Sequence, residues 1–234
     1  MAAEQSPDGR APSEGRAGRA PLVIDVWADV VCPWCYIGVH RIARAVALSM
    51  HAAYIELRPR SFQLEPEAPA GVMNAVELLA HAAGENVDRV RAKGERLARQ
   101  ARAEGLVYET DHVTGNSFDM LRLVHLGRRH GVGWRYLQSM QAAVFGGGPE
   151  AFEPDTLLRL GVAIGIPAAR IREVLNGDRY ADEVRGDRQE AIDRGVTGVP
   201  FAVFAGDEVV PGAASVERYA GAIDRSWSRV RTRG

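Results

Sequence analysis

Apolar positions in the first third of the chain follow two different periods, and their order predicts a structural unit. Residues 22–28 form a nearly continuous apolar run rich in β-branched side chains, which is typical of a strand covered on both faces. Between Cys35 and about Met50 the apolar residues fall on one helical stripe. Within 53–64 apolar and charged residues alternate, which predicts a second strand. Strand, helix and strand in about forty residues indicate a βαβ unit.

The middle of the chain has a different pattern. From Pro66 to about Asn176 nearly every segment has helical periodicity, and the strand-like alternation of the preceding segment is absent. Caps and breakers separate the segments, such as a Pro-Asp pair before one helix and an Asn-Gly pair after another. We expect helices over 76–83, 85–104, 118–129, 133–145, 156–164 and 167–176.

Strand-like patterns return at the end of the chain. A charged helix over 180–194 precedes two short apolar runs at 199–204 and 208–211, which predict a β-hairpin. A final helix is expected after Ser215, whose side chain can cap it. The sheet is therefore split between the two ends of an α/β chain. We expect a disordered tail at 1–20, a discontinuous α/β domain formed by 21–65 and 178–234, and an inserted α-helical domain at 66–177.

The composition is that of an ordinary globular protein, with 46% hydrophobic and 25% charged residues. A formal net charge of −1 provides no field for nucleic acid or for an anionic membrane, so neither partner is expected. No stretch approaches the roughly 18 apolar residues needed to span a bilayer. Residues 1–20 lack the apolar core of a secretory signal, and we therefore expect a cytoplasmic protein.

The candidate chemistry is concentrated at Cys32-Pro33-Trp34-Cys35, which contains the only two cysteines of the chain. Two thiols separated by two residues can close into a disulfide, so redox chemistry is the first hypothesis. The preceding strand and the following helix place Cys32 at a helix N-terminus, where unpaired backbone N–H groups favour a thiolate. We expect Cys32 to attack a substrate sulfur and Cys35 to resolve the mixed disulfide.

Two other uses of the cysteine pair are open at this point. A zinc site would need two further ligands from six scattered histidines, among which His125 and His130 come nearest to a ligand pair. A structural disulfide would be unusual in a cytoplasmic chain. Both hypotheses are weaker than a redox pair. We expect no metal and no cofactor other than the redox-active cysteines themselves.

Pro200 marks a second group of residues, because it follows Gly198-Val199 and opens the predicted hairpin. Alone it is most simply a loop proline at a sheet edge or a bend. With the cysteine motif and three further segments it resembles a known family, the DsbA-like thioredoxin-fold oxidoreductases. The closer resemblance is to the FrnE-type branch, which is related to 2-hydroxychromene-2-carboxylate isomerases and kappa-class glutathione transferases. The matching segments are Cys-Pro-Trp-Cys-Tyr-Ile-Gly at 32–38, Arg-Ser-Phe-Gln-Leu at 60–64, Asn-Ser-Phe-Asp at 116–119, Gly-Val-Thr-Gly-Val-Pro-Phe at 195–201, and Val209 with Pro-Gly-Ala at 211–213.

The resemblance implies a thioredoxin fold interrupted by a large inserted α-helical domain. It also implies a cis Pro200 that faces the thiols, with Val199 offering its backbone N–H and C=O to an extended substrate. Pro33 and Trp34 lie between the sulfurs, where residue identity changes the relative stability of thiolate and disulfide. Trp34 would also give the substrate an apolar surface, unless it packs on the inserted helices.

The chain departs from the family pattern at two places. In thioredoxins and DsbA a buried acid, six positions before the first cysteine, can accept a proton, and here that position is Val26. Asp25 and Asp29 are its neighbours, but neither is assigned this role, and Asp29 equally suits a turn residue before the helix. The Ala-His-Arg common in the middle helix of the family is Met-Leu-Arg at 120–122, and His125 is expected to be an ordinary helix histidine.

Cysteine at both positions separates the branches of the family. In the isomerases and transferases a serine normally replaces the first cysteine, because it orients the thiol of a bound glutathione. A disulfide oxidoreductase needs both sulfurs, so we expect a thiol–disulfide oxidoreductase that acts on protein or small-molecule disulfides. One alternative is an isomerase or transferase that uses a low-molecular-weight thiol as co-substrate on an aromatic or polyketide-like molecule. A non-enzymatic redox-sensing or chaperone-like module is another, and a homodimer is open because relatives dimerise.

Overall fold

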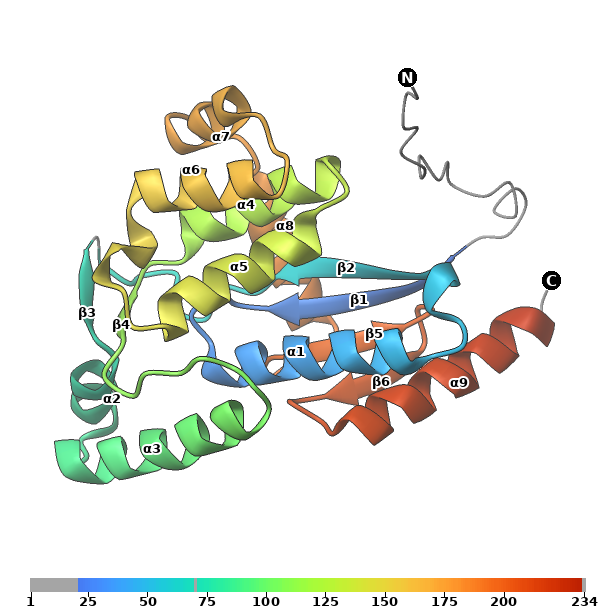
Figure 1. Ribbon diagram of the computed structural model, residues 1–234, viewed down its shortest axis with the longest axis horizontal. Coiled ribbons are helices and arrows are strands. Elements are labelled where there is room, and N and C mark those ends of the chain that lie inside the picture. The colour runs from blue at the N-terminus through green and yellow to red at the C-terminus, as the bar shows by residue number, and fades with distance from the viewer. Residues whose placement is uncertain (1–20, 70, 233–234) are drawn as a thin grey trace, which may run out of the picture.

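A mixed four-stranded sheet contains strands from both ends of the chain (Figure 1). In the computed structural model, which describes residues 21–69 and 71–232, the strand order is β2-β1-β5-β6. β1 is parallel to β2 and antiparallel to β5, and β5 is antiparallel to β6. The predicted contribution of both chain ends to one sheet is confirmed, whereas the predicted disordered tail lies outside the described residues. The strands are β1 (Leu22–Ala28), β2 (Ile55–Ser61), β5 (Phe201–Phe204) and β6 (Glu208–Pro211).

The pleat of β1 directs its side chains to two helical layers. Alternate residues from Leu22 to Val26 pack in an apolar cluster with α1 and α9. Trp27 belongs to a different cluster, on the side of the sheet that α8 covers. Because β1 is covered on both faces, its sequence is apolar almost throughout. The predicted βαβ unit is confirmed, and the three helices are α1 (Pro33–Leu48), α8 (Ala181–Asp193) and α9 (Val216–Thr232).

Helices form most of the segment between β2 and α8, as predicted. The largest apolar cluster contains Cys32, Cys35 and Tyr36 together with side chains of α3, α4, α5, α6 and α7. The cysteine turn is therefore built into the core between the sheet and these helices. Their bounds agree with the predicted ranges to within two residues at each end. They are α2 (Ala75–Ala83), α3 (Val87–Ala103), α4 (Phe118–Arg129), α5 (Gly133–Phe145), α6 (Pro154–Ala163) and α7 (Ala168–Leu175).

A small second sheet corrects the expectation that this segment is helical almost throughout. β3 (Val72–Asn74) pairs antiparallel with β4 (Val113–Gly115). Each strand has three residues, which is too short for an alternating pattern to be visible in the sequence. Two short 3-10 helices were not predicted. η2 (Ala52–Tyr54) replaces the start of the strand expected over 53–64, and η3 (Pro149–Phe152) lies between two predicted helices.

A buried polar cluster joins β2 to α4 and α8. Asp187 of α8 accepts a hydrogen bond from the Ser61 N–H at 2.9 Å and pairs with Arg60 Nε at 2.9 Å. His125 Nε2 of α4 lies 3.3 Å from the Asp187 carboxylate and 3.1 Å from Ser61 Oγ. The Trp27 indole N–H donates to the Asp187 backbone oxygen at 2.9 Å. Because these groups are mostly buried, loss of the Asp187 carboxylate would leave the Ser61 N–H without an acceptor and would remove one of the two carboxylates that pair with Arg60, the other being Glu190.

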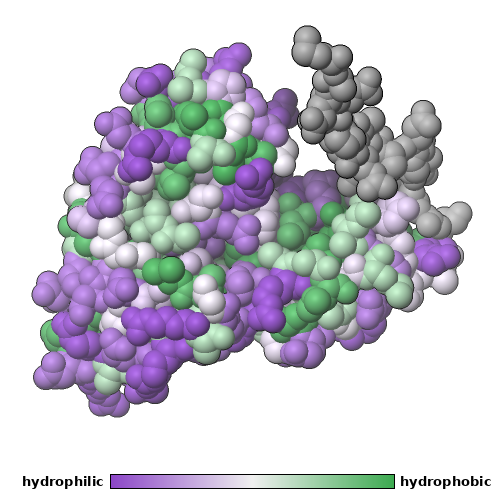
Figure 2. All heavy atoms as spheres, in the orientation of Figure 1, coloured by the Kyte–Doolittle hydropathy of each residue, from purple (hydrophilic) through white to green (hydrophobic). Residues whose placement is uncertain are grey.

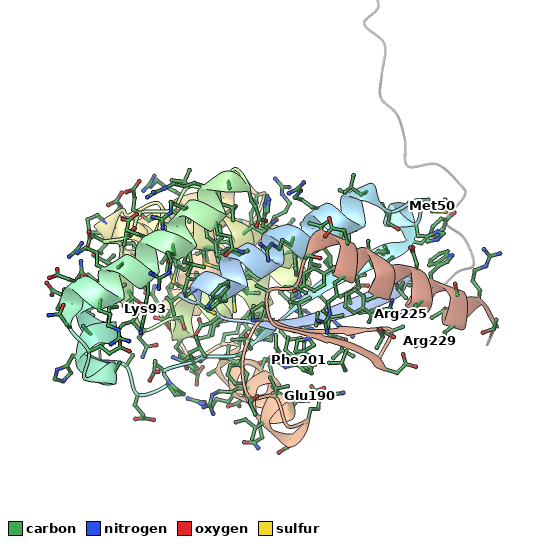
Figure 3. All side chains as sticks on the ribbon, turned by 90° about the horizontal axis from the view of Figure 1, so that it is seen from below. Met50, Lys93, Glu190, Phe201, Arg225 and Arg229 are labelled. Atoms are coloured by element: carbon green, nitrogen blue, oxygen red, sulfur yellow. The ribbon has the colours of Figure 1, made fainter. Side chains whose placement is uncertain are left out.

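Charged side chains hold the outer edge of the sheet and cover the outer helices. Arg225 and Arg229, which Figure 3 shows on α9, pair with Glu208 of β6 at 2.8 and 2.7 Å. Hydrophilic residues gather over α3 in Figure 2, in agreement with the many exposed charged positions of that helix.

Within 21–69 and 71–232, no helix is long and apolar enough to cross a membrane.

Replacing Asp187 by alanine should lower the free energy of unfolding by about 3 to 5 kcal/mol, because the buried Ser61 N–H then has no acceptor and Arg60 loses one of its two carboxylate partners, keeping Glu190. Urea unfolding followed by circular dichroism measures this loss. Asp193→Ala removes an exposed carboxylate from the same helix and is the matched control, with an expected change below about 0.5 kcal/mol. Equal losses in the two variants would contradict the role assigned to the buried cluster.

Candidate active site

Cys32 lies at the turn between β1 and α1 and is the N-cap residue of the helix. Pro33 occupies the first helical turn, where its missing N–H has no helical acceptor to lose. The N–H of Cys35 donates to Cys32 Sγ at 3.3 Å, and both cysteines are free thiols. A donor aimed at a sulfur stabilises a thiolate more than a thiol. The predicted strand-to-helix position of Cys32 is confirmed, and its geometry suits an attacking sulfur.

The two sulfurs differ in accessibility. Cys32 keeps 4% of its surface exposed, whereas Cys35 is fully buried. Burial raises the pKa of the Cys35 thiol well above its usual range, and the adjacent Cys32 raises it further. Trp34 is 48% exposed, so its indole lies on the outer surface beside the pair and is not packed into the inserted helices. Cys32 is therefore the sulfur that a substrate meets first.

Val199 and Pro200 lie against Cys32. The Val199–Pro200 peptide bond is cis, and the Cys32 thiol donates to the Val199 carbonyl with an Sγ···O distance of 3.7 Å. The antiparallel register pairs Trp27 of β1 with Phe201 of β5, which brings the end of one strand to the start of the other. The predicted cis bond and the predicted proximity of Pro200 to the thiols are both confirmed.

Helix α1 also holds the cis-proline loop in place. Gly38 lies so close to this loop that a Cβ atom there would stand 2.5 Å from Pro200 Cγ. Arg41, three residues later, donates at 2.8 Å to the Ala213 carbonyl in the loop after β6, and it forms a largely buried ion pair with Glu104. The N–H of Gly212 in the same loop donates to the Pro200 carbonyl at 2.7 Å. The helix that begins at the cysteines therefore also fixes the loop that faces them.

Asp29 is a fully buried carboxyl just before the cysteine turn. Its Oδ2 accepts the Leu64 N–H at 2.8 Å, its Oδ1 lies 3.5 Å from the Val31 nitrogen, and the Ser117 side chain adds a further hydrogen bond. Burial raises the pKa of Asp29, although these hydrogen bonds act in the opposite direction. Gln141 of α5 donates to the Asp29 backbone oxygen at 3.2 Å. Asp29 thus ties the turn to three other segments.

The neighbouring candidates have other partners. Asp25 pairs with Arg58 of β2 at 2.5 Å. Val26, at the position where relatives carry a buried acid, is fully buried among apolar side chains between β1, α1 and α9. His125 lies in the cluster around Asp187, so its interpretation as a satisfied helix histidine is confirmed. Arg122 donates to the Arg179 carbonyl at 2.9 Å and has a structural role.

In the part of the chain that the structure describes, no three or more His, Cys, Asp or Glu side chains lie close enough together to hold a metal ion, at the cysteine pair or elsewhere. His130, the second histidine of the zinc hypothesis, is the C-cap residue that follows α4.

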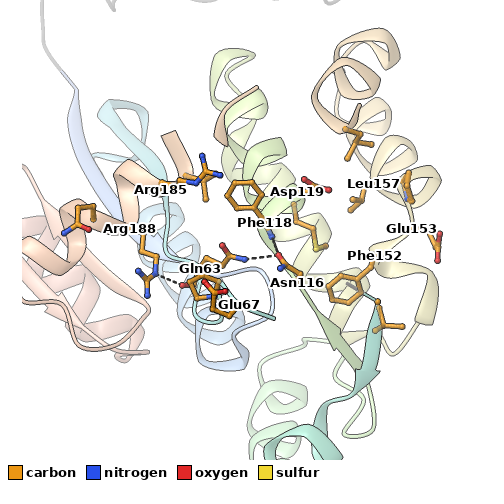
Figure 4. A pocket seen from close by; sticks show the side chains of 18 residues that line it. Gln63, Glu67, Asn116, Phe118, Asp119, Phe152, Glu153, Leu157, Arg185 and Arg188 are labelled. Atoms are coloured by element: carbon orange, nitrogen blue, oxygen red, sulfur yellow. Dashed lines mark hydrogen bonds between the residues drawn. The ribbon is translucent and has the colours of Figure 1, made fainter. Parts of the chain in front are cut away.

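A groove of 870 Å³ lies between the loop after β2 and the helices α4, α6 and α8 (Figure 4). Phe118 and Phe152 belong to its apolar lining, and Arg185 and Arg188 of α8 stand on one side. Arg188 donates to the Gln63 carbonyl at 2.9 Å. The volume of this groove suits a small molecule. The six predicted site residues, Cys32, Pro33, Trp34, Cys35, Val199 and Pro200, are not among those that line it.

Two residues that shape the site are missed by the sequence patterns. Gly38 lies inside a helix, where alanine is intrinsically more favourable, and this is the signal that could have found it. Gln141 is fully buried on the apolar side of α5. A polar residue in an apolar stripe needs a hydrogen-bond partner, and the sequence does not identify Asp29 as that partner.

The combination of a βαβ unit, a helix that begins at a Cys-x-x-Cys pair, and a cis-proline before an antiparallel strand defines a thioredoxin-fold protein. The family model of the DSBA-like thioredoxin domain matches residues 23–224. The chain therefore belongs to the family of DSBA-like thioredoxin domains, as the sequence motifs predict.

Solved structures with a similar fold agree with this assignment. A probable DsbA oxidoreductase from Streptomyces coelicolor is 34% identical, with 88% of this chain and 90% of that chain covered and a TM-score of 0.78. A 2-hydroxychromene-2-carboxylate isomerase is 17% identical over 91% of this chain and 99% of that one, with a TM-score of 0.63. The cytosolic disulfide reductase DsbM from Pseudomonas aeruginosa is 19% identical over 91% and 98%, with a TM-score of 0.56. The last two likenesses show the fold alone.

Gly38→Ala should displace the cis-proline loop and weaken thiol exchange about tenfold or more, because the new methyl group meets the rigid Pro200 ring. Stopped-flow kinetics with a small disulfide measures the exchange rate, and urea unfolding should show a loss of about 1 to 3 kcal/mol. Gly186→Ala is the control, since a Cβ there meets nothing within 4 Å. An unchanged exchange rate in Gly38→Ala would show that the loop does not depend on this contact.

Proposed function

We propose that the protein is a thiol–disulfide oxidoreductase whose redox pair is Cys32-Pro33-Trp34-Cys35. The observation that carries this proposal is the position of Cys32 Sγ between the Cys35 N–H and the Val199 C=O. The N–H favours the thiolate that exchange chemistry needs. The carbonyl lies where an extended substrate could follow the cis-proline loop.

The proposed exchange has two steps. The Cys32 thiolate attacks one sulfur of a substrate disulfide, a bond to that sulfur forms, the substrate S–S bond breaks, and its second sulfur leaves as a thiolate. Cys35 then loses its proton and attacks Cys32 Sγ, which forms the Cys32–Cys35 bond and releases the remaining substrate thiolate. The substrate gains two electrons and the pair loses two. A low-molecular-weight thiol or a protein dithiol, acting as reductant, returns the pair to its starting state.

The remaining predicted residues would position the substrate. Val199 would offer backbone groups to an extended chain beside Cys32, and Pro200 has no N–H that could compete for the sulfur. The exposed Trp34 indole would contact apolar parts of the substrate. Pro33 lies within the first helical turn, between the two cysteines in sequence. At this position it would influence the equilibrium between the dithiol and disulfide forms of the pair.

The substrate class and the compartment form the finer part of the proposal. We infer that disulfides of proteins or small thiols are exchanged in the cytoplasm. The fold that the chain shares with a protein named a cytosolic disulfide reductase is consistent with this location. A homodimer stays a prediction of the family resemblance.

An isomerase or transferase is the rival function within the same fold. Such an enzyme needs one residue to orient a bound thiol, so it has no use for a second sulfur. Exchange chemistry explains why Cys35 is buried directly behind Cys32 and donates its N–H to it. The pair itself therefore supports the oxidoreductase.

Cys35→Ser should trap a mixed disulfide on Cys32, because the resolving sulfur is absent. Cys32→Ser should trap none, since the remaining thiol is fully buried. Incubation with oxidised glutathione followed by intact-mass measurement distinguishes these products, and the wild-type chain, which should end as the Cys32–Cys35 disulfide, is the control. If Cys35→Ser turned over its substrate as fast as the wild type does, the second sulfur would not be needed. That result would reject the oxidoreductase and favour the isomerase or transferase.

A further inference from the structure

A pocket of 350 Å³ lies where α1 meets α5. Its lining includes Tyr36 and His40 of α1, Gln138 and Gln141 of α5, and Leu106, which follows α3. Figure 1 shows α5 alongside the first half of α1, which is the half that begins at the cysteines. Tyr36 directly follows Cys35 in the chain, but neither cysteine is among the residues that line the pocket. The pocket is therefore a neighbour of the redox pair and not a part of it.

Gln141 is an amide that the fold satisfies at one end only. The side chain is fully buried, and its Nε2 donates to the Asp29 carbonyl at 3.2 Å. Because this partner can only accept, it fixes which end of the amide points to the cysteine turn. The Gln141 Oε1 is buried and has no hydrogen-bond partner among the described residues. A buried acceptor without a donor destabilises the folded chain, so this oxygen calls for a donor from outside the protein.

His40 contributes a second acceptor to the same pocket. Its ring forms a hydrogen bond with the Glu104 backbone, whereas its Nε2 is buried without a partner within 21–69 and 71–232. The bond to Glu104 is therefore made by Nδ1. Burial lowers the pKa of His40, so the ring is neutral at pH 7. In a neutral ring whose Nδ1 donates to a carbonyl, Nε2 carries no proton and accepts.

The other residues of the lining disfavour a charged occupant. Val39, Leu106 and Ala142 give the pocket apolar walls, and none of its lining residues in the described part of the chain is Asp, Glu, Lys or Arg. The adjacent Glu104 is already paired with Arg41. An ammonium or carboxylate group would lose its hydration here without gaining a counter-charge. A ligand that suits this lining is neutral, has an apolar part and brings hydrogen-bond donors.

We propose that this pocket binds the primary carboxamide group of a small neutral molecule. The two N–H donors of such a group match Gln141 Oε1 and His40 Nε2, and its carbonyl accepts from the amide of Gln138, which lines the same pocket. An alcohol has one donor and a tertiary amide has none, so each would leave a buried acceptor without a partner. The volume of 350 Å³ lies at the small end of the range for ligand sites, which limits the size of the molecule.

Binding would strengthen the link between α5 and the cysteine turn. Gln141 joins the pocket to Asp29, which precedes Cys32 by three residues. A ligand that holds the amide oxygen also holds the amide nitrogen in its bond to the Asp29 carbonyl, because both atoms belong to one planar group. The ligand does not touch the sulfurs in this arrangement. The inference therefore stands independently of the proposed oxidoreductase function.

Benzamide is the probe for this site, and two analogues are its controls. N,N-dimethylbenzamide has the same ring and carbonyl but no N–H, and benzoate carries a charge. Nuclear magnetic resonance of the full chain follows the Gln141 side-chain amide and the ring nitrogens of His40. Benzamide should shift both in a saturable way, with a dissociation constant on the order of 1 mM for a molecule of this size.

The analogues decide whether the N–H donors matter. Both should bind at least about tenfold more weakly than benzamide, because one lacks the donors and the other would bury a charge. Equal binding of benzamide and N,N-dimethylbenzamide would overturn the proposal. Absence of a saturable shift with benzamide at about ten times the expected dissociation constant would also overturn it, since the pocket would then hold water only.

Ala142→Phe tests whether the binding takes place in this pocket. Ala142 is exposed and lines the pocket, so a phenyl ring at this position occupies part of the pocket from its outer side. The dissociation constant of benzamide should rise about tenfold or more. Ala169→Phe, at an exposed position of α7 that does not line the pocket, is the matched control and should leave the constant unchanged within about twofold. Benzamide binding that is equally strong in the two variants would overturn the assignment to this pocket.

Discussion

The antiparallel pairing of β1 with β5 is the constraint on which the site depends. Its register places Trp27 opposite Phe201, so the residues after β1 and the residues before β5 lie at the same end of the sheet. Cys32 and Val199, 167 positions apart in the chain, therefore come into contact. Neither the cysteine turn nor the cis-proline loop could be held in this geometry by its local sequence alone. Burial of β1 on both faces supplies the stability that keeps the register unique.

The helices of the insertion complete the site by covering it. Their apolar side chains share one cluster with Cys32 and Cys35, so the pair lies at a boundary between sheet and helices and only the first sulfur is accessible. The same packing buries Asp29, which an open turn would leave hydrated. Burial thus has two opposite effects on the chemistry, since it protects the pair from solvent and also removes the water that would otherwise accept a proton from Cys35.

Local patterns in the sequence predicted the long elements well, because helical stripes and the apolar run of β1 are set by short-range periodicity. The cysteine motif and Pro200 could be joined through a family resemblance, and the cis bond and the contact with Cys32 agree with it. The two three-residue strands β3 and β4 could not be predicted, since they are too short to show a period. The roles of Gly38, Asp29 and Asp187 depend on partners distant in sequence, which no local pattern specifies.

The central claim is that Cys32 and Cys35 form a working exchange couple, and the most direct test is their equilibrium with a graded series of reduced and oxidised glutathione. Trp34 fluorescence and thiol alkylation report the state of the pair. The account predicts a two-electron transition with a potential between those of thioredoxin and DsbA, about −270 to −120 mV. A pair that never closes, or that stops at a stable Cys32–glutathione adduct, would contradict it.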